Sequence, residues 1–352
     1  MSDQVGLRMK RLMMVLSGEH PTLPTAEAMA AIKAEHRAYK VVDQLDQVLI
    51  AETKADPSVL ASRLAMCREI CWHLCTAEVK RPIDVLEAIS SSDIIDLLPH
   101  GKTLAVRMKR VKRYLHEIDL PSLEKRVADL IMGEVDFKVD LVRPDIEIVG
   151  VLTSDHCVVG VSAARIHRNK FTLRSPIMRA AFHPTTLKPL LARAMVNLAR
   201  TPRNGTLLDP FCGVGGILIE AGLIGIKPIG VDIDAKMIEG AKHNLEALGV
   251  RDYQLHVGDA RYLTIKDVDA VATDPPYGRQ ATTAGLELKE LYEAALPSIA
   301  QTLKRKGYVC ITAPADLELE GLAQGAGLRM IEKHEQRVHK SLTRKIYVFR
   351  KS

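Results

Sequence analysis

The turn Asp274-Pro275-Pro276-Tyr277 carries the most specific chemical signal in the sequence. Its two prolines stiffen the chain, and Pro275 keeps Asp274 out of the helical region of backbone space. Such a turn presents the Asp274 carboxylate, the Pro275 carbonyl and the Tyr277 ring together. Two acceptors beside a flat ring suit a planar amine, because they hold its N–H groups, favour its nucleophilic form and leave a carboxylate to take the proton. The turn therefore predicts chemistry on an exocyclic amino group.

A glycine loop predicts a second binding feature. An apolar run ends at Asp209, and the loop then passes through Gly213, Gly215 and Gly216, where glycines allow close approach of backbone to a ligand. The dinucleotide pattern fails because Leu218 replaces its third glycine, and a carboxylate at the strand end would repel pyrophosphate. An acid suits a ligand with a positive end, such as S-adenosylmethionine, which carries an ammonium and a sulfonium. A plain strand–turn–helix connection is the alternative.

Acidic residues also follow the next two apolar runs. Asp232 is placed to bind ribose hydroxyls, and Asp259, followed by Ala260, could accept a hydrogen bond from an adenine amino group. Asp234 is better explained as the cap of the helix that follows. Each acid alone would more often be a cap or turn residue. Three acids at successive strand ends, on one edge of a parallel sheet, predict a site for an adenosyl cofactor.

Short apolar runs alternate with helical patterns after about residue 200. This alternation predicts a mostly parallel sheet with helices on both faces. The expected strands are 206–208, 228–231, 253–257, 268–273, 308–312 and 346–349, and the expected helices are 235–248 and 286–303.

The first half of the chain has a mixed pattern. Expected strands are 12–16, 103–109 and the pair 146–153 and 157–164; expected helices are 25–36 capped by Thr25, 59–73, and 120–131 capped by Ser122. We therefore expect two α+β domains, 1–78 and 79–172, followed by an α/β domain over 173–352 that opens with a linker and a helix (173–204).

Composition limits the class of protein. The 352 residues are 47% hydrophobic and 26% charged, as in soluble globular proteins, which excludes fibrous and disordered classes. No apolar run is long enough for a membrane span, and residues 1–14 lack a signal peptide pattern. Three of the six cysteines, Cys67, Cys71 and Cys75, form one stripe on the expected helix 59–73, which predicts core packing rather than zinc or disulfides. Cys212 lacks an adjacent base and is interpreted as a filler. We expect a cytoplasmic protein without a metal.

The distribution of charge is more informative than the net charge of +6. Three stretches, 101–116, 156–208 and 336–352, contain basic residues but no Asp or Glu. Each alone would suggest solvated surface; together they predict a polyanionic partner. The low aromatic content of 4% argues against a sheet surface that stacks single-stranded bases.

The chemical motifs resemble class I S-adenosylmethionine-dependent methyltransferases that act on amino groups, and 183–198 resembles the helix before their glycine loop. Residues 16–21 with 26–27 resemble the start of the archaeal tRNA (guanine-10-N2)-dimethyltransferase family. Segments 103–107, 139–145 and 171–174 resemble its RNA-binding THUMP domain, and 338–344 resembles its C-terminal hairpin, which could contact RNA or simply close the sheet. The resemblance covers nearly the whole chain.

The resemblance implies a fold and a role for each motif. The fold is a Rossmann-like class I methyltransferase domain with an N-terminal α+β half, ferredoxin-like plus THUMP. Asp209, Gly213 and Gly215 would bind the methionine part of the cofactor. Asp232 would bind its ribose, and Asp259 with Ala260 would bind its adenine. The target guanine would be flipped out of its stack and oriented at N2 by Asp274, Pro275 and Tyr277.

A tRNA partner follows from the same resemblance. Basic residues would contact its phosphates: Arg107, Lys109, Arg110, Arg165, Arg168, Lys170 and Arg174. Methylation of adenine N6 or another amino group on a different RNA, and an inactive RNA-binding homologue, stay as alternatives. Position 10 comes only from the family, and one against two methyl groups stays open. We expect a monomer, with a small activator subunit as an open question.

Overall fold

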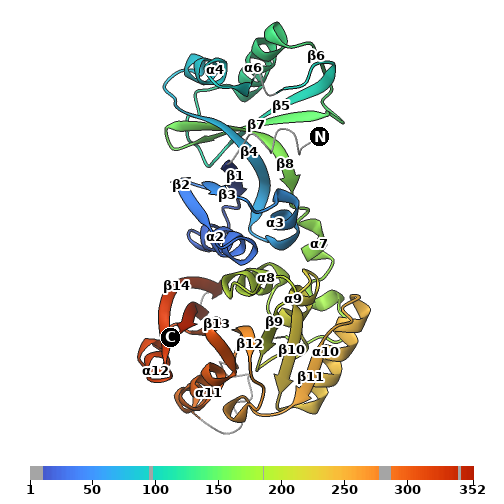
Figure 1. Ribbon diagram of the computed structural model, residues 1–352, viewed down its shortest axis with the longest axis vertical. Helices are drawn as coiled ribbons and strands as arrows, with labels where there is room; N and C mark the ends of the chain where they lie inside the picture. The colour runs from blue at the N-terminus through green and yellow to red at the C-terminus, as the bar shows by residue number, and fades with distance from the viewer. Residues whose placement is uncertain (1–10, 95–97, 185, 277–286, 340–341) are drawn as a thin grey trace. The chain divides into compact units, whose positions relative to one another are not determined.

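The computed structural model describes residues 11–94, 98–184, 186–276, 287–339 and 342–352 (Figure 1). The chain forms two compact units. The first comprises the described residues up to 19 together with 36–62 and 67–166, and the second comprises 20–35, 63–66 and 167–352. The α/β class with an N-terminal α+β half is confirmed. The three-domain division stays a prediction, although one continuous sheet runs through both of the domains expected before residue 172.

The first unit is built on an eight-stranded sheet in the order β2-β3-β1-β4-β8-β7-β5-β6. All neighbours are antiparallel except β5, which runs parallel to β6 and β7. The strands are β1 (Arg11–Leu16), β2 (Tyr39–Leu45), β3 (Val48–Thr53), β4 (Cys67–Glu78), β5 (Lys102–Arg110), β6 (Phe137–Val139), β7 (Ile146–Thr153) and β8 (His156–Arg165).

Two amphipathic helices supply much of the first unit's core. The helices α4 (Pro82–Ser90) and α6 (Leu120–Glu134) bury apolar residues at helical spacing, such as Val85 with Ile89 and Leu123 with Val127, among residues of β5, β7 and β8. The predicted Ser122 cap is wrong, because Asp119 caps α6 by accepting from the Ser122 N–H at 2.8 Å.

The helix expected over 59–73 is wrong. Only a short helix, α3 (Pro57–Arg63), overlaps this range, and it ends at Arg63. Residues Cys67–Glu78 form the long strand β4, which pairs with β1 and β8. A spacing of four residues lies on one face of either a helix or a strand, so the cysteine stripe does not distinguish them. Strand pairing on both sides decides the conformation. Cys67 and Cys71 are buried, and burial raises the pKa of Cys71, which agrees with a packing role.

The second unit contains a seven-stranded sheet in the order β11-β10-β9-β12-β13-β15-β14. The first five are parallel, and β15 and β14 close the sheet as an antiparallel edge. The strands are β9 (Thr206–Asp209), β10 (Lys227–Asp232), β11 (Gln254–Val257), β12 (Val268–Thr273), β13 (Leu303–Pro314), β14 (Leu328–His339) and β15 (Leu342–Lys351). All six strands expected from the sequence are confirmed; β14 was not expected.

The helices of the second unit include one from the N-terminal part of the chain. They are α2 (Leu23–Glu35), α7 (Asn169–Thr172), α8 (Pro189–Leu198), α9 (Gly216–Gly222), α10 (Ala235–Ala247), α11 (Leu288–Thr302) and α12 (Glu320–Gly325), with 3-10 turns η1 (Pro176–Met178) and η2 (Ala260–Tyr262). The Thr25 cap is wrong: α2 starts two residues earlier, where the His20 imidazole accepts from the N–H groups of Thr22 and Leu23.

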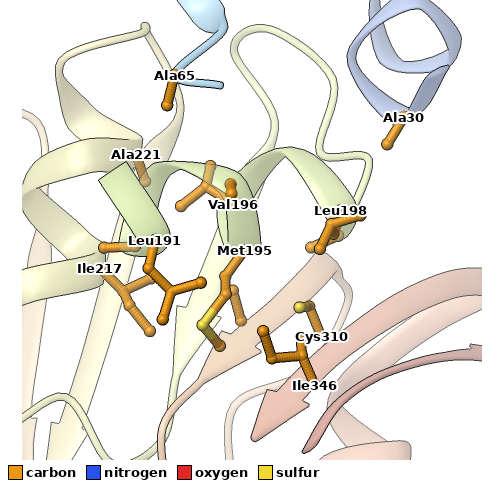
Figure 2. Packing of buried hydrophobic residues seen from close by; sticks show 14 of the residues in the cluster. Ala30, Ala65, Leu191, Met195, Val196, Leu198, Ile217, Ala221, Cys310 and Ile346 are labelled. Atoms are coloured by element: carbon orange, nitrogen blue, oxygen red, sulfur yellow. The ribbon is translucent and has the colours of Figure 1, made fainter. Parts of the chain in front are cut away.

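Helix α8 is buried in one hydrophobic cluster of the second unit's core (Figure 2). Its Leu191, Met195 and Leu198 are buried in one cluster with Ile217 of α9 and Ile346 of β15. The same cluster contains residues of α2. A buried helix that touches elements from both halves of the sequence ties α2 and the glycine-loop helix to one core.

That tie also has a polar component. Glu27 of α2 is fully buried and accepts from the N–H groups of Ala65 and Met66 and from the Asn197 amide of α8 at 2.7 Å. The Arg63 guanidinium donates to the Asn197 side-chain oxygen at 2.9 Å. Because buried polar groups cost free energy unless they are paired, this network fixes α2 against α8.

Candidate active site

The predicted site residues lie where the order of the parallel strands reverses. Strand β9 pairs with β10 on one side and with β12 on the other, so the strand-end residues Asp209, Asp232 and Asp274 fall on the same edge. Ligands of open α/β sheets bind outside the carboxyl ends of strands at such a switch point. The structure therefore brings these three acids together.

Asp209 is the most deeply buried of the three. It is 2% exposed, and its Oδ1 accepts from the Thr273 hydroxyl at 2.7 Å and from the Phe211 N–H at 3.2 Å. Burial raises the pKa of Asp209 to about 7, and the charges of Asp274 and Asp232 act in the same direction. A buried carboxylate with two acidic neighbours favours a cationic ligand.

The glycine loop is held by the next strand. Gly213 and Gly215 have φ values of +50° and +83°, a region that glycine adopts without steric cost. The Gly213 N–H donates to Asp232 Oδ2 at 2.8 Å, while a Cβ at Gly213 would meet no atom within 4 Å. A Cβ at Gly215 would lie 3.3 Å from Ala241 of α10. The loop is therefore held by Asp232 on one side and leaves open space at the Cβ position of Gly213, as a ligand-binding loop requires.

The acids that follow β10 and β11 have different partners. Asp232 is half-buried and also accepts from the Asp234 N–H at 3.0 Å, and Asp234 caps α10, as predicted. Asp259 accepts from the Arg261 N–H at 2.9 Å and from its guanidinium, which lowers the pKa of Asp259. Ala260 is buried at the start of η2. The ribose and adenine roles of these residues stay predictions.

The candidate catalytic turn begins at the end of β12. Asp274 Oδ1 accepts from the Thr312 hydroxyl of β13 and lies 3.7 Å from a terminal nitrogen of Arg344 on β15. Pro275 is buried, and Tyr277 lies outside the described residues. Sequence reasoning missed Thr312 and Arg344 because they are 38 and 70 residues away along the chain. The pairing of Pro314 with Arg344 across β13 and β15 is what brings that arginine near the turn.

The predicted RNA-binding residues separate into groups. Arg107, Lys109 and Arg165 line one cavity of about 300 Å³ in the first unit, together with Glu124 and Glu147. These cations are already paired, since Lys109 and Arg165 contact Glu69, and Arg107 and Arg165 contact Glu147. Their charge is thus partly balanced within the sheet.

The other four predicted RNA contacts lie elsewhere. Arg110 donates to the carbonyls of Leu115 and Ile118 and so closes a loop. Arg174 forms a bidentate pair with Glu220, at 3.0 Å for both contacts, and Arg168 and Lys170 lie half-buried near α7. The RNA roles of all seven residues stay predictions.

Two absences apply to the described part of the chain. No helix there is both long and apolar enough to cross a bilayer. No group of three or more His, Cys, Asp or Glu side chains in those ranges has the arrangement of a metal site.

The parallel sheet, the glycine loop and the strand-end acids define a class I S-adenosylmethionine-dependent methyltransferase. Residues 176–346 match the RMKL-like methyltransferase domain family and residues 84–162 match the THUMP domain family. The chain belongs to the archaeal tRNA (guanine(10)-N2)-dimethyltransferase family. It is 36% identical over 339 residues to the member from Methanothermobacter thermautotrophicus, covering 96% of this chain and 98% of that protein.

Further comparisons agree with this assignment. The tRNA (guanine(10)-N2)-dimethyltransferase of Methanocaldococcus jannaschii is 32% identical over 365 residues, covering 96% of this chain and 99% of that protein. The crystal structure of TrmN from Thermus thermophilus is 20% identical with a TM-score of 0.52, covering 97% of this chain and all of that one, and supports the fold. The predicted family, enzyme class and cofactor are confirmed.

The buried acid at the glycine loop predicts a pH-dependent cofactor affinity. Because the pKa of Asp209 is raised to about 7, the side chain is largely neutral below that pH, and binding a cation must then release its proton. We expect the affinity for S-adenosylmethionine to rise by up to about tenfold per pH unit from pH 5.5 toward 7 and then to level off. Titration calorimetry between pH 5.5 and 8 measures this.

Two variants separate this effect from other titrations. Asp209→Asn should bind the cofactor more weakly and show no rise across this pH window. Asp259→Asn should keep the wild-type pH dependence, because Arg261 lowers the pKa of Asp259 below the window. A wild-type affinity that is flat from pH 5.5 to 7 contradicts the prediction.

Proposed function

We propose that this protein transfers methyl groups from S-adenosylmethionine to N2 of guanosine 10 in tRNA, giving the mono- and dimethylated products. The observation that carries the proposal is the match over nearly the full length to relatives named for this reaction. The acid cluster and the Asp274-Pro275 turn at the switch point support the same chemistry. The cofactor fits, because its sulfonium and ammonium complement the buried acids.

The reaction places specific demands on this chain's residues. When bound, S-adenosylmethionine supplies an electrophilic methyl group on sulfur. Asp274 and the Pro275 carbonyl hold the two N–H groups of the guanine amine, so that its nitrogen lone pair faces the methyl group. Asp274 accepts the proton that the nitrogen loses as the C–N bond forms and the bond between the methyl carbon and sulfur breaks. Tyr277 is proposed to stack on the base.

Thr312 and Arg344 orient the Asp274 carboxylate in this scheme. The Thr312 hydroxyl and the Arg344 guanidinium both approach Oδ1 of Asp274, from two different strands. The arginine cation also complements the negative charge of the carboxylate. The two residues therefore keep Asp274 as an acceptor.

Arg344→Gln should lower the rate of methyl transfer roughly tenfold, which corresponds to about 1.4 kcal/mol of lost transition-state stabilisation. Cofactor affinity should change little, because Arg344 contacts the acceptor for the amine. Single-turnover transfer to tRNA and calorimetry with S-adenosylhomocysteine measure the two quantities. Arg344→Lys should recover part of the rate. Arg350→Gln, on the same strand, is the matched control, and an equal loss in both Gln variants would refute the positioning role.

Nucleoside mass spectrometry tests the proposed function directly. The purified protein is incubated with S-adenosylmethionine and an unmodified tRNA transcript, which is then digested. We expect N2-methylguanosine and N2,N2-dimethylguanosine, and their loss when guanosine 10 is replaced by adenosine. N6-methyladenosine as the product, or no product despite demonstrated cofactor binding, would overturn the proposal in favour of another substrate or an inactive homologue.

The first unit is proposed to dock the tRNA. The THUMP match and the cavity lined by Arg107, Lys109 and Arg165 support this role. We further propose a monomer that acts in the cytoplasm, with a small activator subunit as a possible partner. Light scattering tests the oligomeric state, for which we expect one chain per particle. Product formation by the protein alone would show that no activator subunit is needed.

A further inference from the structure

Among the described residues of the second unit, one buried cation has no acidic partner within ion-pair distance. Arg179, at the end of η1, is 9% exposed. Its Nε donates to the Arg174 carbonyl at 3.0 Å, but neither terminal guanidinium nitrogen has a hydrogen-bond partner among the described residues. A buried guanidinium without an anion is costly, so a fold that retains one indicates a ligand that completes it.

The chain's nearby acid is already used. The Glu220 carboxylate, which is fully buried, accepts two contacts from Arg174 and one from Arg193 at 2.8 Å. Two arginines therefore share this carboxylate, and no ion pair joins Arg179 to it. The segment that carries all three arginines, 156–208, contains no Asp or Glu. The missing negative charge must come from outside this set.

The unpaired guanidinium lies against the glycine loop. A terminal nitrogen of Arg179 is 3.4 Å from the position that a Cβ on Gly216 would occupy, and the Thr186 methyl is 3.0 Å from that same position. Gly216 directly follows the loop residues Gly213 and Gly215. The lack of a side chain at 216 allows the guanidinium to approach the end of the loop.

The charges around the loop match the methionine end of the cofactor. That end carries an ammonium and a carboxylate on one carbon, next to the sulfonium. The buried Asp209 at the start of the loop complements the positive groups. The Arg179 guanidinium, next to Gly216 at the end of the loop, is a bidentate donor of the kind that carboxylates prefer.

We propose that Arg179 binds the carboxylate of S-adenosylmethionine and makes the site selective for an intact methionine group. The proposal rests on the proposed function only through the cofactor, and it is independent of which base is methylated. Arg174 and Arg193 hold Glu220 and do not share this role.

Decarboxylated S-adenosylmethionine tests the proposal, because it keeps both cationic groups and lacks only the carboxylate. By calorimetry, the wild-type protein should bind S-adenosylmethionine about 10- to 100-fold more tightly than the decarboxylated ligand. Arg179→Gln should lose that preference by weakening the intact cofactor alone, and Arg179→Lys should recover part of it. Lys188→Gln, at an exposed position of the same acid-free segment, is the control and should bind as wild type.

Several results would overturn the proposal. Equal affinity of the wild-type protein for both ligands would overturn it, and this test needs no variant. If the Arg179→Gln variant is folded by circular dichroism but loses affinity equally for both ligands, the role of Arg179 is structural and the proposal fails. Unchanged cofactor binding with weakened tRNA binding would assign the guanidinium to an RNA phosphate. Normal ligand selectivity without any methylated guanosine would instead refute the proposed function and leave this proposal standing.

Discussion

Replacing Asp274 by Asn is expected to reduce methyl transfer by roughly 10²- to 10⁴-fold while leaving S-adenosylmethionine bound. Asparagine has nearly the same shape as aspartate and can still contact Thr312, but its amide cannot take a proton from the guanine amine. The substitution also removes one of the charges that raise the pKa of Asp209. Cofactor affinity below pH 7 should therefore be the same or higher. Single-turnover transfer and calorimetry on one preparation measure both effects.

The matched control for this experiment is Asp316→Asn. Asp316 is exposed just after β13 and should leave the transfer rate unchanged. Thr312→Val adds an intermediate case, because it removes one contact to the carboxylate and keeps the carboxylate itself. Full activity in Asp274→Asn would remove Asp274 from the chemistry. A loss of cofactor binding equal to the loss of rate would make it a cofactor ligand instead.

The strand-end acids could be located from the sequence because of the sheet's construction. Parallel strands buried on both faces have continuous apolar runs, and their carboxyl ends share one edge. Once runs such as 206–208 and 268–273 were identified, the positions of Asp209 and Asp274 on that edge followed. No side-chain contact was needed for this inference.

The partners of those acids could not be located in the same way. Arg344 reaches Asp274 because Arg344 is in register with Pro314, where β13 pairs with β15. That register depends on tertiary packing, and nothing near either residue in the sequence specifies it. Strand β14 was missed for a related reason. Its many charged residues obscure the alternation of apolar and polar residues that is typical of a strand, and its conformation is stabilised by pairing with β15 at the sheet edge.

Charge counting along the sequence identified basic segments but not their partners. Lys109 and Arg165 both lie in acid-free stretches, yet both pair with Glu69 of β4. A window of sequence contains only local acids, whereas a sheet places distant strands side by side. The same limit made Arg174 look like a surface cation, although Glu220 of α9 holds it in the interior.

Replacing Glu220 by Gln is expected to lower the free energy of unfolding by about 3–5 kcal/mol, the usual cost of breaking a buried ion pair from one side. The fully buried carboxylate is the shared partner of Arg174 and Arg193. A neutral amide would leave these cations uncompensated beside Arg179, in a region where their charge cannot reach water. Urea denaturation followed by far-ultraviolet circular dichroism measures the loss.

The comparison that identifies the cause is a double-mutant cycle. If Glu220 acts through its arginines, Arg174→Gln and Glu220→Gln together should cost less than the sum of the single losses, by about 0.5–3 kcal/mol. Glu239→Gln, at an exposed position of α10, should change stability by less than about 0.5 kcal/mol. Strictly additive losses would mean that the pair does not stabilise the fold as a unit. Because α9 follows the glycine loop directly, the Glu220 variant should also bind S-adenosylmethionine more weakly, which links the stability of this cluster to the site.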